Sequence, residues 1–121
     1  KVDLIRGEGD TVEIVDFKAE RKPDMEKMRD RLERYRRQLH IYAHLVEERT
    51  GRKVSKMHLY YTGEGGGVPT ITYPYTKSAV EGTLASFDDT VHKIMKKDFR
   101  HCAEDPKVCA GCDFRFYCRN R

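Results

Sequence analysis

Long apolar runs are missing from this sequence of 121 residues. None approaches the roughly 18 consecutive apolar residues that a membrane-spanning helix requires, so the sequence predicts no membrane span. The start of the chain also lacks a charged-then-apolar leader, and a cytoplasmic location is therefore the default expectation. Neither GxxxxGKS nor GxxxxGKT occurs, so an ATP-driven motor would have to lie outside these residues.

Cysteine is missing from most of the chain, because all four cysteines lie within residues 102–118. Their spacing is C-x6-C-x2-C-x5-C. In a reducing compartment this pattern favours a metal site over disulfides, and four thiolates could bind Zn²⁺ tetrahedrally. We therefore divide the chain into a core, residues 1–100, and a cysteine-rich metal-binding tail, residues 101–121.

Charge is abundant but unevenly placed. Charged residues make up 36% of the chain and the formal net charge is +4. Basic residues gather between 21 and 37, including Arg29, Arg34, Arg36 and Arg37. A solvated helix face explains this clustering, and a nucleic-acid-binding surface is the alternative.

Strand and helix patterns alternate along the core. Residues 1–6 and 11–18 read as strands joined by a tight, glycine-containing antiparallel turn. Apolar residues at three- and four-residue steps predict a helix over 24–49, which Gly51 would end.

The second half of the core repeats this order. Residues 54–62 and 68–75 read as strands, and Ser78-x-x-Glu81 predicts a capping box that opens a helix through Lys97. The order predicts an α/β fold, a mixed sheet flanked by helices. Because the chain begins directly on strand residues, we expect an N-terminally truncated fragment.

Polar residues replace apolar ones at the end of the second predicted strand. Alternation places Asp16 and Lys18 on the face of the apolar residues before them. A simple hairpin would set Asp3 opposite Ile14 and diagonal to Asp16, about 7–8 Å apart. Two such carboxylates could bind a divalent cation. A plain ion pair between Asp16 and Lys18 is the alternative.

Gln38 and Tyr42, four residues apart, share one face of the first predicted helix. Together with them, the segments "KVDLI", "VDFK" and "QLHIY" resemble the PD-(D/E)XK nuclease superfamily, specifically its RecB-like branch. The resemblance implies a restriction-endonuclease-like fold in which Asp3, Asp16 and the Phe17 carbonyl bind Mg²⁺ or Mn²⁺. It further implies that Lys18 positions or activates the attacking water, and that Gln38 and Tyr42 arrange DNA and the active site.

The remaining polar residues near these motifs are given no catalytic role. RecB-like enzymes usually have a histidine ligand before the first strand, whereas His40 and His44 follow the lysine and should be surface or half-buried helix residues. Alternation points Glu13 to the opposite face as a surface residue. Glu20 could continue the active face past Lys18 and stays unassigned.

The tail segment "CAGCDFRFYC" resembles the C-terminal motif of RecB-like nucleases that carry a 4Fe-4S cluster, such as AddB-type subunits. The resemblance implies that Cys109, Cys112 and Cys118 are cluster ligands. There the fourth cysteine lies upstream of the nuclease core, so Cys102 is only a possible substitute, and Zn²⁺ is the alternative metal.

Residues 54–99 look like the C-terminal nuclease domain of UvrD/PcrA-type superfamily 1 helicases. This resemblance implies a metal-dependent DNA nuclease, the exonuclease-type domain of a larger helicase-nuclease in DNA repair or recombination. DNA and the helicase domains of the parent protein would be its partners, and the four clustered arginines would bind DNA. A non-catalytic DNA-binding module and a structural zinc-binding interaction domain are the alternatives.

Overall fold

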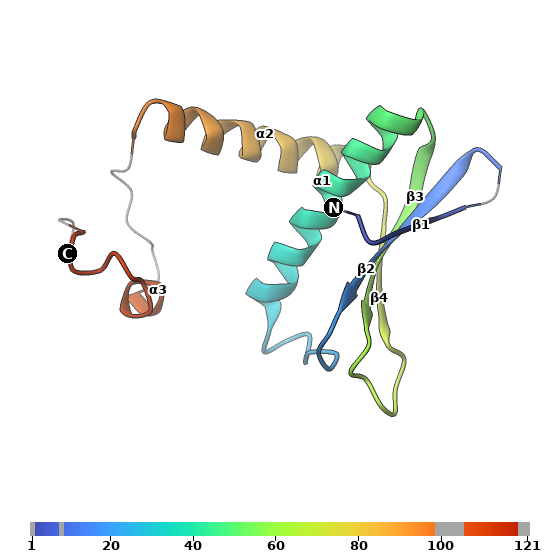
Figure 1. Ribbon diagram of the computed structural model, residues 1–121, viewed down its shortest axis with the longest axis horizontal. Coiled ribbons are helices and arrows are strands. Elements are labelled where there is room, and N and C mark those ends of the chain that lie inside the picture. Colours follow the sequence, from blue (N-terminus) through green and yellow to red (C-terminus); the bar gives the residue numbers. More distant parts are fainter. Residues whose placement is uncertain (1, 8, 99–105, 119–121) are drawn as a thin grey trace. The chain divides into compact units, whose positions relative to one another are not determined.

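The computed structural model describes residues 2–7, 9–98 and 106–118. A four-stranded sheet has the order β1-β2-β3-β4 (Figure 1), formed by Leu4–Arg6, Thr11–Lys18, Lys53–Tyr61 and Thr70–Pro74. The central pair β2–β3 is parallel, whereas β1–β2 and β3–β4 are antiparallel. The predicted mixed sheet is therefore confirmed.

In these ranges three helices accompany the sheet: α1 (Arg29–Thr50), α2 (Lys77–Met95) and the short α3 (Pro106–Ala110). The helix α1 connects the parallel strands β2 and β3 and packs against both (Figure 1). Its Leu39 and Ala43 are fully buried against Ile14, Met57 and Leu59 of the sheet. This shared core confirms the predicted α/β class.

The helix α1 begins five residues later than predicted, at Arg29 instead of Asp24. The Asp24 carboxylate accepts hydrogen bonds from the backbone N–H groups of Glu26 and Lys27, at 3.0 and 3.2 Å. This local bonding forms a turn before the helix. The predicted end is confirmed, since Gly51 has φ 68° and its N–H donates to the Glu47 carbonyl.

The register of the first hairpin differs from the prediction. Arg6 pairs with Glu13, not with Thr11, so the connecting turn is longer than a tight hairpin. A Cβ atom at Gly7 would clash with the Thr11 carbonyl oxygen, and Gly9 has φ 63°. The slip of two residues preserves the alternation of faces, and extending the register by one residue places Asp3 opposite Asp16.

The second helix begins at Lys77, so Ser78 lies in its first turn and the predicted capping box is wrong. Val80 of this helix is buried, whereas its Phe87 and Ile94 are exposed. The chain forms two compact units, Lys1–Ser86 and Phe87–Arg121.

Within residues 2–7, 9–98 and 106–118, no helix combines the length and apolar character needed to cross a membrane.

Candidate active site

Asp16 and Lys18 lie at the end of β2 on the face that α1 covers. The Asp16 side chain is 6% exposed and that of Lys18 is 15% exposed. Lys18 Nζ lies 2.7 Å from Asp16 Oδ2, although Oδ2 has no partner of hydrogen-bond geometry among the residues that the structure describes. At this distance the two groups form a close ion pair whatever the angle between them, and the carboxylate oxygen keeps lone pairs for another ligand.

Gln38 and Tyr42 of α1 extend this pair into a chain of contacts. Lys18 Nζ donates a hydrogen bond to Gln38 Oε1 at 3.2 Å, and Gln38 Nε2 donates to the Tyr42 hydroxyl at 2.9 Å. Tyr42 also borders a hollow of about 410 Å³ that is lined by Val2 and Ile5 on either side of Asp3. The helix thus brings together the residues that the sequence placed in one site.

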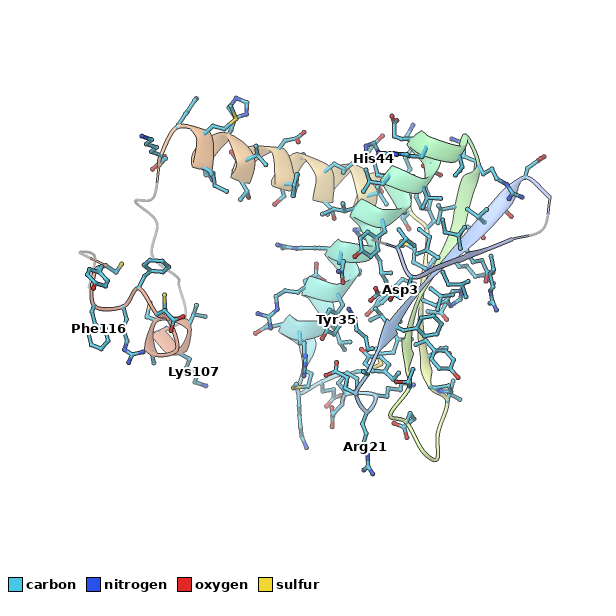
Figure 2. All side chains as sticks on the ribbon, viewed as in Figure 1. Asp3, Arg21, Tyr35, His44, Lys107 and Phe116 are labelled. Carbon is cyan, nitrogen blue, oxygen red and sulfur yellow. The ribbon has the colours of Figure 1, made fainter. Side chains whose placement is uncertain are left out.

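Asp3 reaches the same region from the residue before β1, and Figure 2 labels it between α1 and the sheet. Its Oδ2 accepts a hydrogen bond from the Phe17 backbone N–H at 3.0 Å. The N–H and C=O of one strand residue point to the same side of the strand. The Phe17 carbonyl oxygen therefore also faces the Asp3 side of β2, while its ring is exposed on the opposite face of the sheet.

The donor atoms of this site are oxygens. Two carboxylates and one backbone carbonyl suit Mg²⁺, which commonly binds through one or two carboxylates and keeps several waters. Within the described ranges, no group of three or more His, Cys, Asp or Glu side chains is placed to hold a metal ion. Asp3, Asp16 and Phe17 therefore fit a partly hydrated Mg²⁺ or Mn²⁺, and a closed site made of side chains alone is not formed.

Sequence reasoning left Glu20 unassigned and missed Tyr35 and Arg31 altogether, which the structure links to Lys18. Its Nζ lies 3.9 Å from the centroid of the Tyr35 ring. The Tyr35 hydroxyl contacts Arg31 and Glu20, which also form an ion pair at 2.7 Å. Alternation along β2 did point to Glu20, whereas no sequence signal singled out Tyr35 or Arg31.

The clustered arginines lie on different sides of α1. Arg34 precedes Gln38 by four residues and shares the face of Gln38 and Tyr42. Arg36 and Arg37 lie instead beside Glu33, with nitrogen–oxygen distances of 3.1 and 3.6 Å.

Arg29, four residues before Glu33, belongs to that second stripe. It lines a hollow together with Arg36 and Tyr73.

Glu13 is a half-buried side chain and not the free surface residue that we expected. It bonds Arg6 at 2.7 Å and His58 at 3.1 Å on the opposite face of the sheet. The hydrogen bond from Arg6 is the main cause that lowers the pKa of the Glu13 carboxyl.

The two histidines of α1 differ in burial. His44 is half-buried as predicted. His40 is buried, contrary to the prediction, and its Nδ1 lies 2.7 Å from Thr83 Oγ1 of α2. Burial is the main cause that lowers the pKa of His40, and Arg36 adds to it.

The cysteines of the tail lie on and after α3. Cys109 and Cys118 are exposed and Cys112 is partly exposed, all as free thiols. Cys102 lies outside the described residues. In residues 106–118 these thiols do not converge on one metal position.

Comparisons with known proteins show which family and which relative the chain is similar to. The sequence model of a family described as "PD-(D/E)XK nuclease superfamily" matches residues 1–119. One subunit of an ATP-dependent helicase/nuclease from Carboxydothermus hydrogenoformans is 42% identical over 60 residues, which cover 50% of this chain and 5% of that protein. The chain thus corresponds to a small part of that relative. No solved structure matches the chain.

Proposed function

The chain belongs to the PD-(D/E)XK nuclease superfamily, and we propose that it hydrolyses phosphodiester bonds of DNA with the help of Mg²⁺ or Mn²⁺. One observation carries the proposal: Lys18 Nζ lies between Asp16 Oδ2 and Gln38 Oε1, at 2.7 and 3.2 Å. The buried carboxylate offers an oxygen ligand for a metal ion, and the ammonium group beside it is a positive hydrogen-bond donor; both assist phosphodiester hydrolysis.

Each protein group has a distinct task in this reaction. Asp3, Asp16 and the Phe17 carbonyl would hold the metal ion, which supplies an acidified water and neutralises charge on the phosphate when it is bound. Lys18 donates hydrogen bonds that orient the attacking water or a phosphate oxygen. The water oxygen forms its bond to phosphorus and gives up a proton to solvent, while the bond to the leaving oxygen breaks and that oxygen takes up a proton from solvent.

Gln38 and Tyr42 act on Lys18 rather than on phosphorus. The Gln38 amide accepts from Lys18 and donates to Tyr42, so its orientation is fixed at both ends. A lysine side chain is flexible and loses considerable rotamer entropy when it is held in one place. The two helix residues therefore hold the ammonium group near the carboxylate before substrate binds.

The similarity to a helicase/nuclease subunit supports the view that the chain is part of a larger protein. We propose that the chain is the exonuclease-type domain of a helicase-nuclease in DNA repair or recombination, acting beside helicase domains of the same parent protein. Arg34, on the Gln38 and Tyr42 face, would contact DNA phosphates, and Arg29, Arg36 and Arg37 would extend the contact along α1.

The tail would bind a second metal centre. Cys109, Cys112 and Cys118 are the proposed ligands of a 4Fe-4S cluster, which is held by four thiolates. Three thiols do not complete that set, so the fourth ligand would be Cys102 or a cysteine elsewhere in the parent protein. Zn²⁺ remains the alternative metal.

The change Asp16→Asn in the parent protein tests the main proposal, because it keeps the side-chain shape and removes the charge. Cleavage of DNA with Mg²⁺ should fall by at least about 100-fold, the scale of loss for such electrostatic groups. Asp88→Asn, an exposed carboxylate on α2, is the matched control and should cut normally.

Two outcomes would count against this assignment. Normal cutting by Asp16→Asn would remove Asp16 from the chemistry. A wild-type protein that binds DNA but cuts with neither Mg²⁺ nor Mn²⁺ would instead be a non-catalytic DNA-binding module.

A further inference from the structure

The Lys18 ammonium group has three different neighbours. Two are the oxygens of Asp16 and Gln38, and the third is the face of the Tyr35 ring, whose centroid lies 3.9 Å from Nζ. An ammonium group over the face of an aromatic ring is attracted by the ring's negative potential. Tyr35 therefore adds a third attraction to those of Asp16 and Gln38.

The Tyr35 ring is itself held at its hydroxyl. The hydroxyl accepts a hydrogen bond from Arg31 Nε at 3.2 Å and donates one to Glu20 Oε1 at 3.2 Å. Arg31 and Glu20 close this triangle with their own ion pair at 2.7 Å. Figure 2 labels Tyr35 on α1, between the helix and the sheet. The ring is thus anchored to both the helix and the segment after β2.

The position of Glu20 is fixed by the backbone beyond β3. The Thr62 N–H donates to the Lys18 carbonyl at 3.0 Å, and the Gly63 N–H donates to the Glu20 carbonyl at 3.1 Å. A Cβ atom at Gly63 would lie 2.8 Å from the Glu20 carbonyl carbon. This close approach of two backbones requires glycine and holds the Glu20 end of the triangle in place.

We propose that Tyr35 is a positioning residue for Lys18, anchored by Arg31 and Glu20, and that its ring face holds the ammonium group in place beside Asp16 and Gln38. The ring limits the rotamers open to the lysine side chain, so the ammonium group stays where the proposed reaction uses it. The proposal rests on the proposed function, because it explains how Lys18 is held in position for that reaction.

Three variants separate the ring, its hydroxyl and simple packing. Tyr35→Leu removes the ring, Tyr35→Phe keeps the ring and removes its anchor, and Tyr73→Leu removes another partly buried tyrosine that packs against the core. Single-turnover cleavage and DNA affinity are measured for each in the parent protein, with folding checked by circular dichroism.

Tyr35→Leu should lower the cleavage rate by about 3- to 30-fold, the range expected for loss of one cation–π contact. DNA affinity should change little, because the ring does not bind the substrate. Tyr35→Phe should lie between Tyr35→Leu and wild type, and Tyr73→Leu should cut at the wild-type rate. A wild-type rate for Tyr35→Leu, or an equal loss for Tyr73→Leu, would overturn the proposal.

A spectroscopic measurement tests the contact without any cleavage. Protons over the face of an aromatic ring resonate upfield, so the ε-methylene protons of Lys18 should be shifted upfield in wild type and Tyr73→Leu but not in Tyr35→Leu. Lys18→Arg identifies the resonance. If wild type does not cut DNA, the proposed function fails, and this shift alone decides the Tyr35 contact: an unshifted wild-type resonance rejects it.

Discussion

Tyr61 is a fully buried residue of β3 whose hydroxyl has no hydrogen-bond partner within the described part of the chain. Burial raises the pKa of Tyr61 to about 12, so the hydroxyl stays protonated at neutral pH. A buried polar group without a partner loses its hydration and gains nothing in return. At the scale of one residue, this hydroxyl therefore lowers the stability of the core.

We therefore predict that Tyr61→Phe leaves the free energy of unfolding unchanged or raises it by up to about 1 kcal/mol. Tyr75→Phe is the matched control, because the Tyr75 hydroxyl donates to Glu47 Oε2 at 3.0 Å. It should lower the free energy of unfolding by about 1 kcal/mol. Urea denaturation measures both, and equal losses in the two variants would contradict the assignment of Tyr61 as unpartnered.

His40 is a single residue that makes the free energy of unfolding depend on pH. Its folded-state pKa is lowered from 6.5 by burial, so the unfolded chain binds a proton more readily than the folded one below that pH. Stability from this group is complete above pH 6.5 and is lost as pH falls from 6.5 through the lower folded-state pKa. Acid therefore destabilises the fold, because protonation would place a charge on a buried imidazole.

The prediction is a urea midpoint that falls between about pH 7.5 and 5.5 in wild type. His40→Asn offers a polar atom to Thr83 but does not titrate in this range, so its midpoint should fall less. An identical decline in wild type and His40→Asn would assign the pH dependence to other groups.

At the scale of elements, the arginines of α1 lie on two different faces of the helix. Arg34 lies on the face of Gln38 and Tyr42, and no ion pair engages it among the described residues. Arg36 is instead 3.1 Å from Glu33 Oε2. An arginine that is already paired with a carboxylate contributes less to DNA affinity, because its ion pair must break before it binds a phosphate.

Arg34→Ala should accordingly flatten the salt dependence of DNA affinity by about 0.7–0.9 in the slope of log K against log salt, the value for one phosphate contact. Arg36→Ala should change the slope less. Fluorescence anisotropy across a salt series measures both variants, and a larger effect for Arg36→Ala would reverse the proposed order.

The same element explains what the sequence could predict. Periodicity located α1, and Gly51 marked its end, because a left-handed residue there is a local requirement. The start of α1 and the register of the first hairpin depended on side-chain bonds and turn geometry, as at Asp24 and Gly7, which periodicity does not encode. The faces of Asp16 and Lys18 were predictable because alternation survives a two-residue slip.

Tyr35 was not predictable as a neighbour of Lys18. It fitted the apolar stripe of the helix equally well, and only the packing of α1 on β2 brings its ring to the ammonium group. Sequence motifs found the residues with reactive groups, whereas the residue proposed to position them emerged from tertiary contacts.

At the scale of the whole molecule, the second compact unit, Phe87–Arg121, holds all the described cysteines. We predict that changing Cys109, Cys112 or Cys118 singly to serine in the parent protein removes iron and sulfide, because a cluster needs all of its thiolates. Retention of iron in Cys102→Ser would place the fourth ligand elsewhere, whereas its loss would make Cys102 that ligand. Stoichiometric zinc in wild type would reject the iron-sulfur proposal.

The shortness of β1 has a consequence for how the site is completed. This edge strand pairs with β2 over only Leu4, Ile5 and Arg6, and Asp3 lies just beyond the last pair. A short edge strand held by few pairs opens locally at a lower free-energy cost than a central strand. Fraying of β1 would remove Asp3 from the site while Asp16, on a central strand, stays in place.

A cation that binds both carboxylates would bind only the closed hairpin, and mass action would then favour closure. Amide hydrogens of Leu4–Arg6 should exchange with solvent faster than those of β2 without divalent cation, and should slow when Mg²⁺ is added. In Asp3→Asn the same amides should stay fast at every Mg²⁺ concentration. The occupancy of this candidate metal site would then follow an equilibrium between a frayed and a closed edge of the sheet.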